Sequence, residues 1–131
     1  MVHKKATGRI ESDKLRVFVV WLPRYPGDNR SKAVSSMSNV PDARGTHFWD
    51  SNASLAKQYG VVLGLPEGSK FAWDTYMAFD VNATWNDAPP KPIDWMHQLS
   101  QDLGREHPRW LNSDQFRKRV MTLLSGAAAR E

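Results

Sequence analysis

The apolar run VFVVWL at residues 17–22 predicts a strand that extends over residues 15–22. Alternate side chains of a strand point to opposite faces, and in this run both sets are apolar. Such a pattern is typical of a central strand in an α/β protein, where helices cover both faces of the sheet. The run ends at Pro23, and the polar segment RYPGD that follows predicts a stiff loop at the tip of the strand.

A helix and a second strand are expected after this loop. Asp28 and Asn29 are both good N-caps, and either predicts a helix that runs through Ser38. The inner face of this helix would consist of three apolar residues, Ala33, Val34 and Met37. The turn-forming pentapeptide PDARG then leads to a short strand over residues 46–49. A helix that crosses over between two strands in this way makes the strands parallel.

The middle of the chain predicts a second helix and an antiparallel pair of strands. Asp50 occupies an N-cap position before a helix that runs through Tyr59, and Gly60 is a natural terminator for it. Residues 71–80 alternate between apolar and polar side chains, which is typical of a half-exposed strand. Its apolar face would comprise Trp73, Thr75, Met77 and Phe79. Residues 81–85 are either its hairpin partner or its continuation.

Two further helices are predicted near the C-terminal end. Pro92 is suited to open a helix through Leu103, and a last helix begins at Asn112 or Ser113 and ends at Gly126. The expected order of elements is therefore β-α-β-α-β-β-α plus an extra C-terminal helix. We expect an α/β fold with a central mixed β-sheet flanked by helices.

The length of 131 residues fits a single domain over residues 1–131. Residues 1–14 have no clear periodicity and are expected to form a loose arm, with a short edge strand near residues 7–10. Residues 105–131 are expected to form a helical extension. The run 17–22 is too short for a signal peptide or a membrane span, so we expect a cytoplasmic protein with no membrane partner.

The chain contains no cysteine and six tryptophans. Without cysteine there can be no disulfide, no thiol nucleophile, no redox dithiol and no zinc site with sulfur ligands. Each tryptophan can bury about 150–250 Å², so these side chains should contribute much of the packing. No cofactor is expected, because the sequence has no glycine-rich phosphate loop and no metal-ligand spacing.

The formal net charge is +4, and both ends of the chain are basic while its middle is acidic. This balance permits nucleic-acid binding without requiring it. The run Arg117-Lys118-Arg119 lies on the polar side of the last predicted helix, where a solvated face is the usual explanation. A nucleic-acid surface would require this run to join Lys4, Lys5 and Arg9 in one patch.

Two segments resemble the thioredoxin-like fold. The string LAKQYGVVLGLP, residues 55–66, is similar to the helix and turn that lead to that family's cis-proline, which Pro66 would match. WLPRYPGD, residues 21–28, lies where the family carries its Cys-x-x-Cys loop. The strings VVWLP, HFWD and YG also look like uncharacterised bacterial thioredoxin-like proteins, some of them carried on mobile elements. Both active-site cysteines are absent and Glu67-Gly68 follows Pro66, so the resemblance implies a fold but no dithiol chemistry.

In a sheet of this topology, residues 21–28, 49–50 and 66–73 should converge at one edge. Ligands of open α/β sheets tend to bind at that edge. Three tryptophan walls with a few polar anchors would suit a small molecule or a peptide, and Arg24 could hold a carboxylate or phosphate. The candidate site residues are Trp21, Arg24, Tyr25, Asp28, His47, Trp49, Asp50, Pro66 and Trp73.

Each of these residues also has a structural explanation. The tryptophans would then belong to the core, Arg24 would be a solvated loop residue, and Asp50 would be an N-cap. A metal site built from His47, Asp74 and His97 has no spacing signature to support it. A single helical histidine such as His97 is usually a packed or surface residue.

The sequence thus favours a non-redox binding or interaction module. The alternatives are an enzyme of unknown reaction that uses His47 and Arg24, and a basic protein associated with nucleic acid. A homo-oligomer formed through a strand face that bears Tyr76 is also left open, because an exposed aromatic face is a suitable partner surface.

Overall fold

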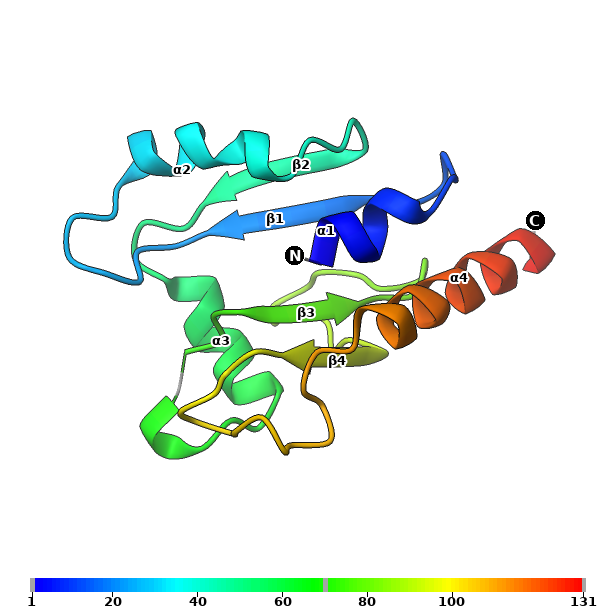
Figure 1. The fold of residues 1–131 in the computed structure, drawn as a ribbon. Coiled ribbons are helices and arrows are strands. Elements are labelled where there is room, and N and C mark those ends of the chain that lie inside the picture. The colour runs from blue at the N-terminus through cyan, green and yellow to red at the C-terminus, as the bar shows by residue number, and fades with distance from the viewer. Residues whose placement is uncertain (1, 70, 131) are drawn as a thin grey trace.

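The computed structural model describes residues 2–69 and 71–130, which form a mixed α/β structure with two small sheets (Figure 1). The elements, in chain order, are α1 (Val2–Lys5), η1 (Thr7–Arg9), β1 (Val17–Trp21), α2 (Arg30–Ser36), η2 (Met37–Asn39), β2 (Gly45–Trp49), α3 (Ser54–Val62), η3 (Glu67–Ser69), β3 (Thr75–Ala78), β4 (Asp94–His97) and α4 (Ser113–Arg130).

The first sheet confirms the predicted parallel pair. β1 and β2 are parallel and aligned from Val17 opposite Gly45 to Trp21 opposite Trp49. The intervening helix α2 begins after Asn29, whose side-chain oxygen accepts a hydrogen bond from the Lys32 backbone N–H at 2.9 Å. This N-cap satisfies one of the backbone donors that every helix start leaves unpaired.

The covering of β1 on both faces, however, was predicted wrongly. Phe18 is 66% exposed and Phe48 is 49% exposed, and their ring centroids lie 6.3 Å apart on the same face of the sheet. On α2, Ala33 is buried while Val34 and Met37 remain exposed. One helix can cover only one face of a two-stranded sheet. The apolar side chains of β1 that point to the other face therefore remain exposed.

The second sheet differs more from the prediction. β3 pairs antiparallel with β4, so its partner is not residues 81–85. β4 lies inside the segment predicted as a helix over residues 92–103. Side chains of β4 alternate between two apolar environments, Met96 on one face and Trp95 on the other. Burial on both faces stabilises a strand here although helical spacing is also present.

The β3–β4 sheet lies between two hydrophobic clusters. On one face, Ala78 and Met96 pack with buried residues of α4 and the N-terminal segment; the members of this cluster include Ala6, Ile10, Phe116 and Val120. On the other face, Met77 and Trp95 pack against α3; this cluster includes Tyr59, Leu65, Ala72, Trp73, Phe79 and Leu99. Phe116 and Val120 thus form the buried face of α4, and the predicted apolar face of residues 73–79 is confirmed for Trp73, Met77 and Phe79.

The described strands do not form the single central sheet that was expected. In Figure 1 they follow one another in the order β2, β1, β3, β4, but hydrogen bonds join only β1 to β2 and β3 to β4. The neighbouring edges of β1 and β3 are therefore open within the described residues. The packing of α3 and α4 on opposite faces of β3–β4 stabilises that sheet without β1.

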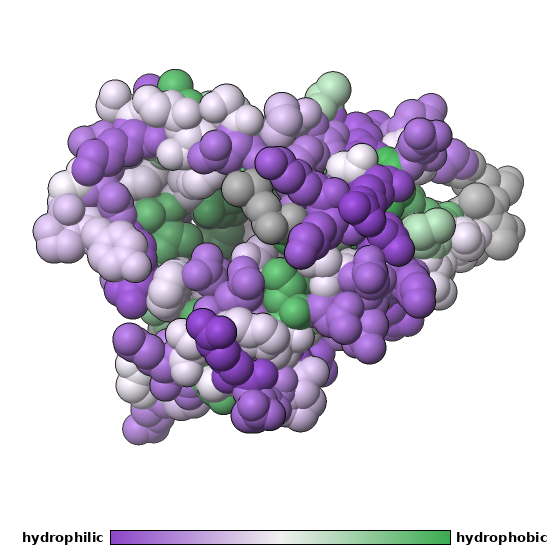
Figure 2. Space-filling model, in the orientation of Figure 1, coloured by the Kyte–Doolittle hydropathy of each residue, from purple (hydrophilic) through white to green (hydrophobic). Residues whose placement is uncertain are grey.

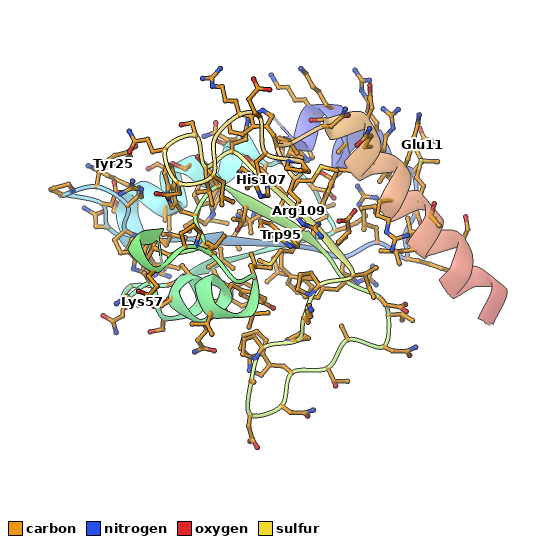
Figure 3. All side chains as sticks on the ribbon, turned by 90° about the horizontal axis from the view of Figure 1, so that it is seen from below. Glu11, Tyr25, Lys57, Trp95, His107 and Arg109 are labelled. Carbon is orange, nitrogen blue, oxygen red and sulfur yellow. The ribbon has the colours of Figure 1, made fainter. Side chains whose placement is uncertain are left out.

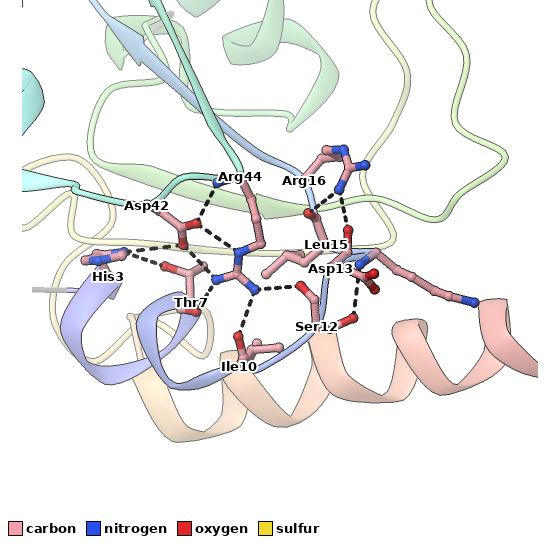
Figure 4. A network of polar contacts seen from close by, with 10 residues as sticks. His3, Thr7, Ile10, Ser12, Asp13, Leu15, Arg16, Asp42 and Arg44 are labelled. Carbon is pink, nitrogen blue, oxygen red and sulfur yellow. Dashed lines mark hydrogen bonds and ion pairs between the residues drawn. The ribbon is translucent and has the colours of Figure 1, made fainter.

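The N-terminal segment is not a loose arm. Its residues form α1 and η1, and Ala6 and Ile10 are buried, so the expected edge strand near residues 7–10 is also absent. The Arg44 guanidinium holds this segment (Figure 4), donating to the carbonyl oxygens of Thr7 at 2.8 Å, Ile10 at 2.7 Å and Ser12 at 3.0 Å. One long-range arginine therefore orders residues whose own sequence has no strong periodicity.

Several element ends also differ from the prediction. Gly60 lies inside α3, which continues to Val62, and Gly64 takes the left-handed conformation just beyond it, with φ of 68°. α4 continues past Gly126 to Arg130. The peptide bonds of the described residues are trans, including the bond before Pro66. None of the described helices is long and apolar enough to cross a lipid bilayer.

Candidate functional site

The ends of β1 and β2 are held together by Asp50. Its backbone N–H donates to the Trp21 carbonyl oxygen at 2.8 Å, which extends the ladder by one residue. Its carboxylate accepts from the backbone N–H groups of Ser54 at 3.0 Å and Leu55 at 2.9 Å. Asp50 therefore caps the start of α3, as predicted, from four residues before Ser54, and Ala53 completes the turn with a left-handed φ of 54°.

The loop after β1 is closed by Asp28. One carboxylate oxygen accepts from the backbone N–H groups of Arg24 at 2.9 Å and Tyr25 at 2.7 Å, and the Asp28 N–H donates to the Tyr25 carbonyl oxygen. The hydrogen bond from the Tyr25 N–H is the main reason that the pKa of Asp28 lies below its usual value. Gly27 has a φ of 87°, which only glycine adopts at low cost. The polar loop is thus a fixed turn.

Arg24 reaches from this loop to the segment before β3. Its guanidinium carbon lies 4.2 Å from the centre of the Trp73 ring and 5.4 Å from that of Tyr25. Such contacts between a cation and aromatic faces stabilise by about 0.5–1 kcal/mol at exposed sites. Burial raises the pKa of Asp74, and the positive charge of Arg24 offsets part of that rise. The predicted convergence of residues 21–28 with Trp73 is present.

A small cavity lies where α2 meets the ends of the first sheet. Its volume is about 130 Å³ and its lining comprises Trp21, Leu22, Asp28, Asn29, Lys32, Ala33, Ser36 and Trp49. Ligand pockets for drug-sized molecules occupy roughly 300–1,000 Å³. The cavity is therefore of a size to accept one side chain or a few atoms, and it does not fit a larger organic ligand.

His47 supports Trp21 and does not pair with Asp50. The Trp21 indole N–H donates to Nδ1 of His47 at 3.0 Å, and the two rings are stacked with an interplanar angle of 9°. The described residues contain no cluster of three histidine, aspartate or glutamate side chains that could hold a metal ion. His47 thus positions an aromatic wall of the cavity.

Pro66 does not join the other candidates at this cavity. It is exposed, it precedes η3, and it is not among the residues that line the cavity. In Figure 1 this part of the chain, in green beside the grey trace, lies below the loop that follows β1. The predicted edge therefore holds eight of the nine candidates in two contact groups, around Trp21 and around Trp73.

The open edge of β1 is an additional feature that sequence reasoning missed. The Val17 N–H donates to the Arg44 carbonyl oxygen, and the Trp21 carbonyl oxygen accepts from the Asp50 N–H. The backbone groups of Val17, Val19 and Trp21 therefore point toward β2. Because consecutive residues of a strand point their backbone groups in opposite directions, those of Phe18 and Val20 face the open edge. Figure 2 shows apolar side chains, in green, recessed between the parts of the molecule that contain β1 and β3.

The open edge of β3 is assigned in the same way. The Gln98 N–H donates to the Asp74 carbonyl oxygen, and Tyr76 lies opposite Met96 in β4. The backbone groups of Thr75 and Met77 therefore face away from β4. The side chain of Tyr76 packs beside the α4 cluster, and its hydroxyl donates to Gln98 at 2.7 Å. Burial raises the pKa of Tyr76 to about 12, so this residue is partly covered by its own chain.

A second group of polar residues, also missed from sequence, surrounds the fully buried His97. Its Nδ1 accepts from the Leu99 backbone N–H at 3.0 Å, and its Nε2 lies 3.0 Å from Nδ1 of His107. Because Nδ1 of His97 accepts a hydrogen bond, the ring hydrogen is on Nε2, which donates a hydrogen bond to Nδ1 of His107. Burial lowers the pKa of His97, and the charge of His107 lowers it further.

Arg109 links the histidine pair to β4, and Figure 3 shows it beside His107 and Trp95. Its Nη1 donates to the Asp94 carboxylate at 2.9 Å and to the Trp95 carbonyl oxygen at 3.0 Å, and its guanidinium lies over the Trp95 ring. Its backbone N–H donates to Nδ1 of His107 at 3.1 Å. Nδ1 of His107 therefore accepts two hydrogen bonds, one from His97 and one from the Arg109 backbone.

The expected C-terminal extension is helical only from Ser113. Before it, the His97 N–H donates to Arg109 and the His97 carbonyl accepts from Leu111, which forms a short parallel bridge to β4. The sequence spacing of His97 and His107 does not predict that they are in contact, because residues 92–103 were expected to form a helix. Only the pairing of β4 with β3 brings this segment beside them.

Comparisons of the chain with protein-family models, with curated proteins and with solved structures returned no match.

Proposed function

We propose that this chain is a thioredoxin-like domain that works as a peptide-binding module, with an extended peptide pairing along the open edge of β1. The absence of cysteine excludes thiol-disulfide exchange. The remaining chemistry at the strand ends consists of aromatic surfaces, fixed backbone turns and one arginine, which together suit binding.

The order of elements supports the fold assignment. From β1 to α4 the chain follows β-α-β-α-β-β-α, with a parallel first pair and an antiparallel second pair. The same order was expected from the sequence, although its last strand and helix were predicted at residues 81–85 and 92–103 and not at β4 and α4. In a complete sheet of this kind β1 would pair directly with β3, and the described residues lack those hydrogen bonds, so the edge of β1 has no strand partner of its own on that side.

The observation that carries the function is the open edge of β1. Phe18 and Val20 present one N–H and one C=O each, and the exposed ring of Phe18 stands beside them. Unpaired strand edges are templates for another extended chain. Peptides bind such edges through main-chain hydrogen bonds and place alternate side chains in pockets.

The cavity beside Trp21 and Trp49 favours a peptide over a small molecule. It accepts one side chain of a ligand whose remaining contacts lie elsewhere on the surface. Lys32 contributes a cationic group to its lining, and Arg24 lies nearby over Trp73. An acidic or amide side chain would satisfy these donors.

The experiment begins with a random peptide library selected against the immobilised full-length chain. An enriched peptide is then titrated by calorimetry against wild type, Val20→Pro and Val20→Ala. Proline removes the N–H at the open edge and leaves the bonds to β2 in place, because those come from Val19 and Trp21. One lost backbone hydrogen bond is worth about 0.5–1.5 kcal/mol, so we expect an affinity about 3- to 12-fold lower.

Val20→Ala is the matched control, since it shortens the same side chain and keeps the N–H. It should bind the peptide with nearly wild-type affinity. Circular dichroism of both variants shows whether β1 remains folded. Equal loss in the two variants would assign the effect to the side chain and would contradict pairing along the edge.

A further inference from the structure

A basic surface forms where α1 meets the first part of α4 (Figure 1). The Arg117 Nη1 donates to the Lys5 carbonyl oxygen at 3.4 Å. Beneath this contact, Val2 packs against the buried cluster that contains Phe116 and Val120. We call this surface the α1–α4 basic surface. It is defined by Lys5 and Arg117, which are in contact, and by their basic neighbours along the chain, Lys4, Arg9, Lys118 and Arg119. Figure 2 shows hydrophilic side chains, in purple, over α1 and α4.

This surface carries more positive charge than the rest of the chain. Residues 2–10 contain no carboxylate, and the described side chains of α4 include one, Asp114, which pairs with Arg117 at 3.3 Å. Among the ion pairs of the described residues, Asp42 is the one other carboxylate that contacts the N-terminal segment, through His3. Nη2 of Arg44 lies 2.7 Å from Oδ2 of Asp42 and neutralises its charge. In the adjoining segment, Glu11 and Asp13 are balanced by Lys14 and Arg16.

The surface is hollowed beside α1. A depression of about 440 Å³ is lined by His3, Lys4, Gly8, Ser38, Asn39 and Pro41. Its size falls in the range of ligand pockets, and the Lys4 ammonium and the Asn39 amide are hydrogen-bond donors in its lining. A side chain at Gly8 would not fit, because its Cβ would lie 2.7 Å from the His3 carbonyl oxygen. These donors suit phosphate oxygens.

From these observations we propose that the α1–α4 basic surface binds the phosphate backbone of double-stranded nucleic acid without regard to base sequence. The proposal goes beyond the proposed function, since it uses other residues than the edge of β1. Lysine and arginine contacts to phosphates release counterions and supply non-specific affinity. None of the strongly exposed aromatic residues belongs to α1, η1 or the described part of α4, so stacking on unpaired bases is not expected.

A membrane surface fits these residues less well. Helices that lie on lipid bury an apolar face in the interface beside their cationic residues. The apolar side chains of α4 that would do this, Phe116 and Val120, are already buried in the protein core. Among the described residues of α4, Met121 is the one large apolar side chain that is exposed, at 49%. A single apolar side chain beside this much charge favours the nucleic-acid backbone over a lipid surface.

The test measures fluorescence anisotropy of a labelled 20-base-pair DNA duplex with the full-length chain at increasing salt. Neutralising three to four phosphates predicts an affinity about 40- to 150-fold lower at roughly 200 mM salt than at roughly 50 mM. The double variant Lys4→Glu/Lys118→Glu should bind at least about 10-fold more weakly, with a shallower salt dependence.

The control variant Lys57→Glu/Lys91→Glu changes the net charge by the same amount at exposed positions outside the surface. Figure 3 shows Lys57 on α3, away from α4. The affinity of this control variant for the duplex should fall by less than about 3-fold. An equal loss in both variants, or no binding of the duplex at roughly 50 mM salt, would overturn the proposal. So would tighter binding to anionic phospholipid vesicles than to the duplex.

Since all four lysines are exposed, both variants should retain the wild-type circular dichroism spectrum. Single Lys→Ala changes at positions 4 and 118 provide a milder second pair of variants.

Discussion

Nε2 of His97 lies 3.0 Å from Nδ1 of His107, and His97 is fully buried. Because Nδ1 of His97 accepts a hydrogen bond from Leu99, Nε2 of His97 carries hydrogen and donates to Nδ1 of His107. A proton added to Nδ1 of either ring would displace a backbone N–H, because Leu99 donates to the first ring and Arg109 to the second.

The first prediction concerns stability against pH. Burial, and secondarily the charge of His107, lower the pKa of His97 below that of the unfolded chain. The unfolded state therefore binds the proton first, and the stabilisation present at pH 7.5 is lost as the pH falls through about 6.5, the unfolded pKa, toward the lower folded pKa. We expect urea denaturation to give a free energy of unfolding that falls by about 1 kcal/mol more in wild type than in His97→Gln between pH 7.5 and pH 5.5.

Asp74 contributes in the opposite direction. Burial raises its pKa, so the folded state binds its proton more readily and stability from this group falls as the pH rises. The comparison with His97→Gln cancels this contribution. The same pH dependence in wild type and His97→Gln would show that His97 is not the group responsible.

A second prediction concerns Arg44. Replacing it with alanine leaves the Asp42 carboxylate, whose side chain is 5% exposed, without its partner and removes the donors to the N-terminal segment. Loss of a largely buried pair with these bonds should cost about 2–4 kcal/mol in chemical denaturation. Arg16→Ala is the control: its guanidinium donates to Asp13 and Leu15 at the exposed surface and should cost less than about 0.5 kcal/mol.

The same pair predicts an acid transition. The hydrogen bond from Arg44 lowers the pKa of Asp42 to about 2. Its stabilisation is complete above the unfolded pKa of about 3.9 and is lost as the pH falls toward 2. Asp42→Asn should therefore flatten the stability curve between pH 4 and pH 2. An unchanged curve would place the acid transition on other carboxylates.

The third prediction concerns the cap of α3. Asp50→Ala leaves the N–H groups of Ser54 and Leu55 without their acceptor and should destabilise by about 1–2 kcal/mol. Asp50→Asn keeps one acceptor oxygen and should cost about half as much. Urea midpoints of the two variants measure the difference, and a larger loss in the asparagine variant would assign another role to the charge of Asp50.

Local patterns predicted the first sheet well. The apolar run at residues 17–21, the polar caps before α2 and the helical spacing of Phe116 and Val120 all depend on neighbours in sequence. Asp50 was also predicted as a cap, and only its distance from the first helical residue differed. In each case one short segment contains the information needed.

The second sheet could not be predicted in this way. Ile93, Met96, Leu99 and Leu103 have helical spacing, while Trp95 and Met96 also suit a strand with two apolar faces. The choice depends on β3 being available as a partner, which is a long-range property. The N-terminal segment is similar, because Arg44 orders it from outside.

The candidate site was predicted in its composition more than in its geometry. Arg24 and Trp73 meet as expected for the predicted edge, and Trp21 and Trp49 line one cavity. The partner of His47 was not foreseen, because a hydrogen bond from an indole to an imidazole across two strands has no sequence signal. The open edge of β1 was missed because six consecutive apolar residues indicate a covered strand.

The central claim is that β1 has an open edge, and amide hydrogen exchange measured by NMR on the free protein tests it most directly. The N–H groups of Val19 and Trp21 bond to β2 and should exchange slowly, whereas those of Phe18 and Val20 should exchange at least about 100-fold faster. Adding the selected peptide should slow exchange at Phe18 and Val20 alone among these four. Slow exchange at all four in the free protein would mean that β1 already has a partner on that side, and would contradict the account.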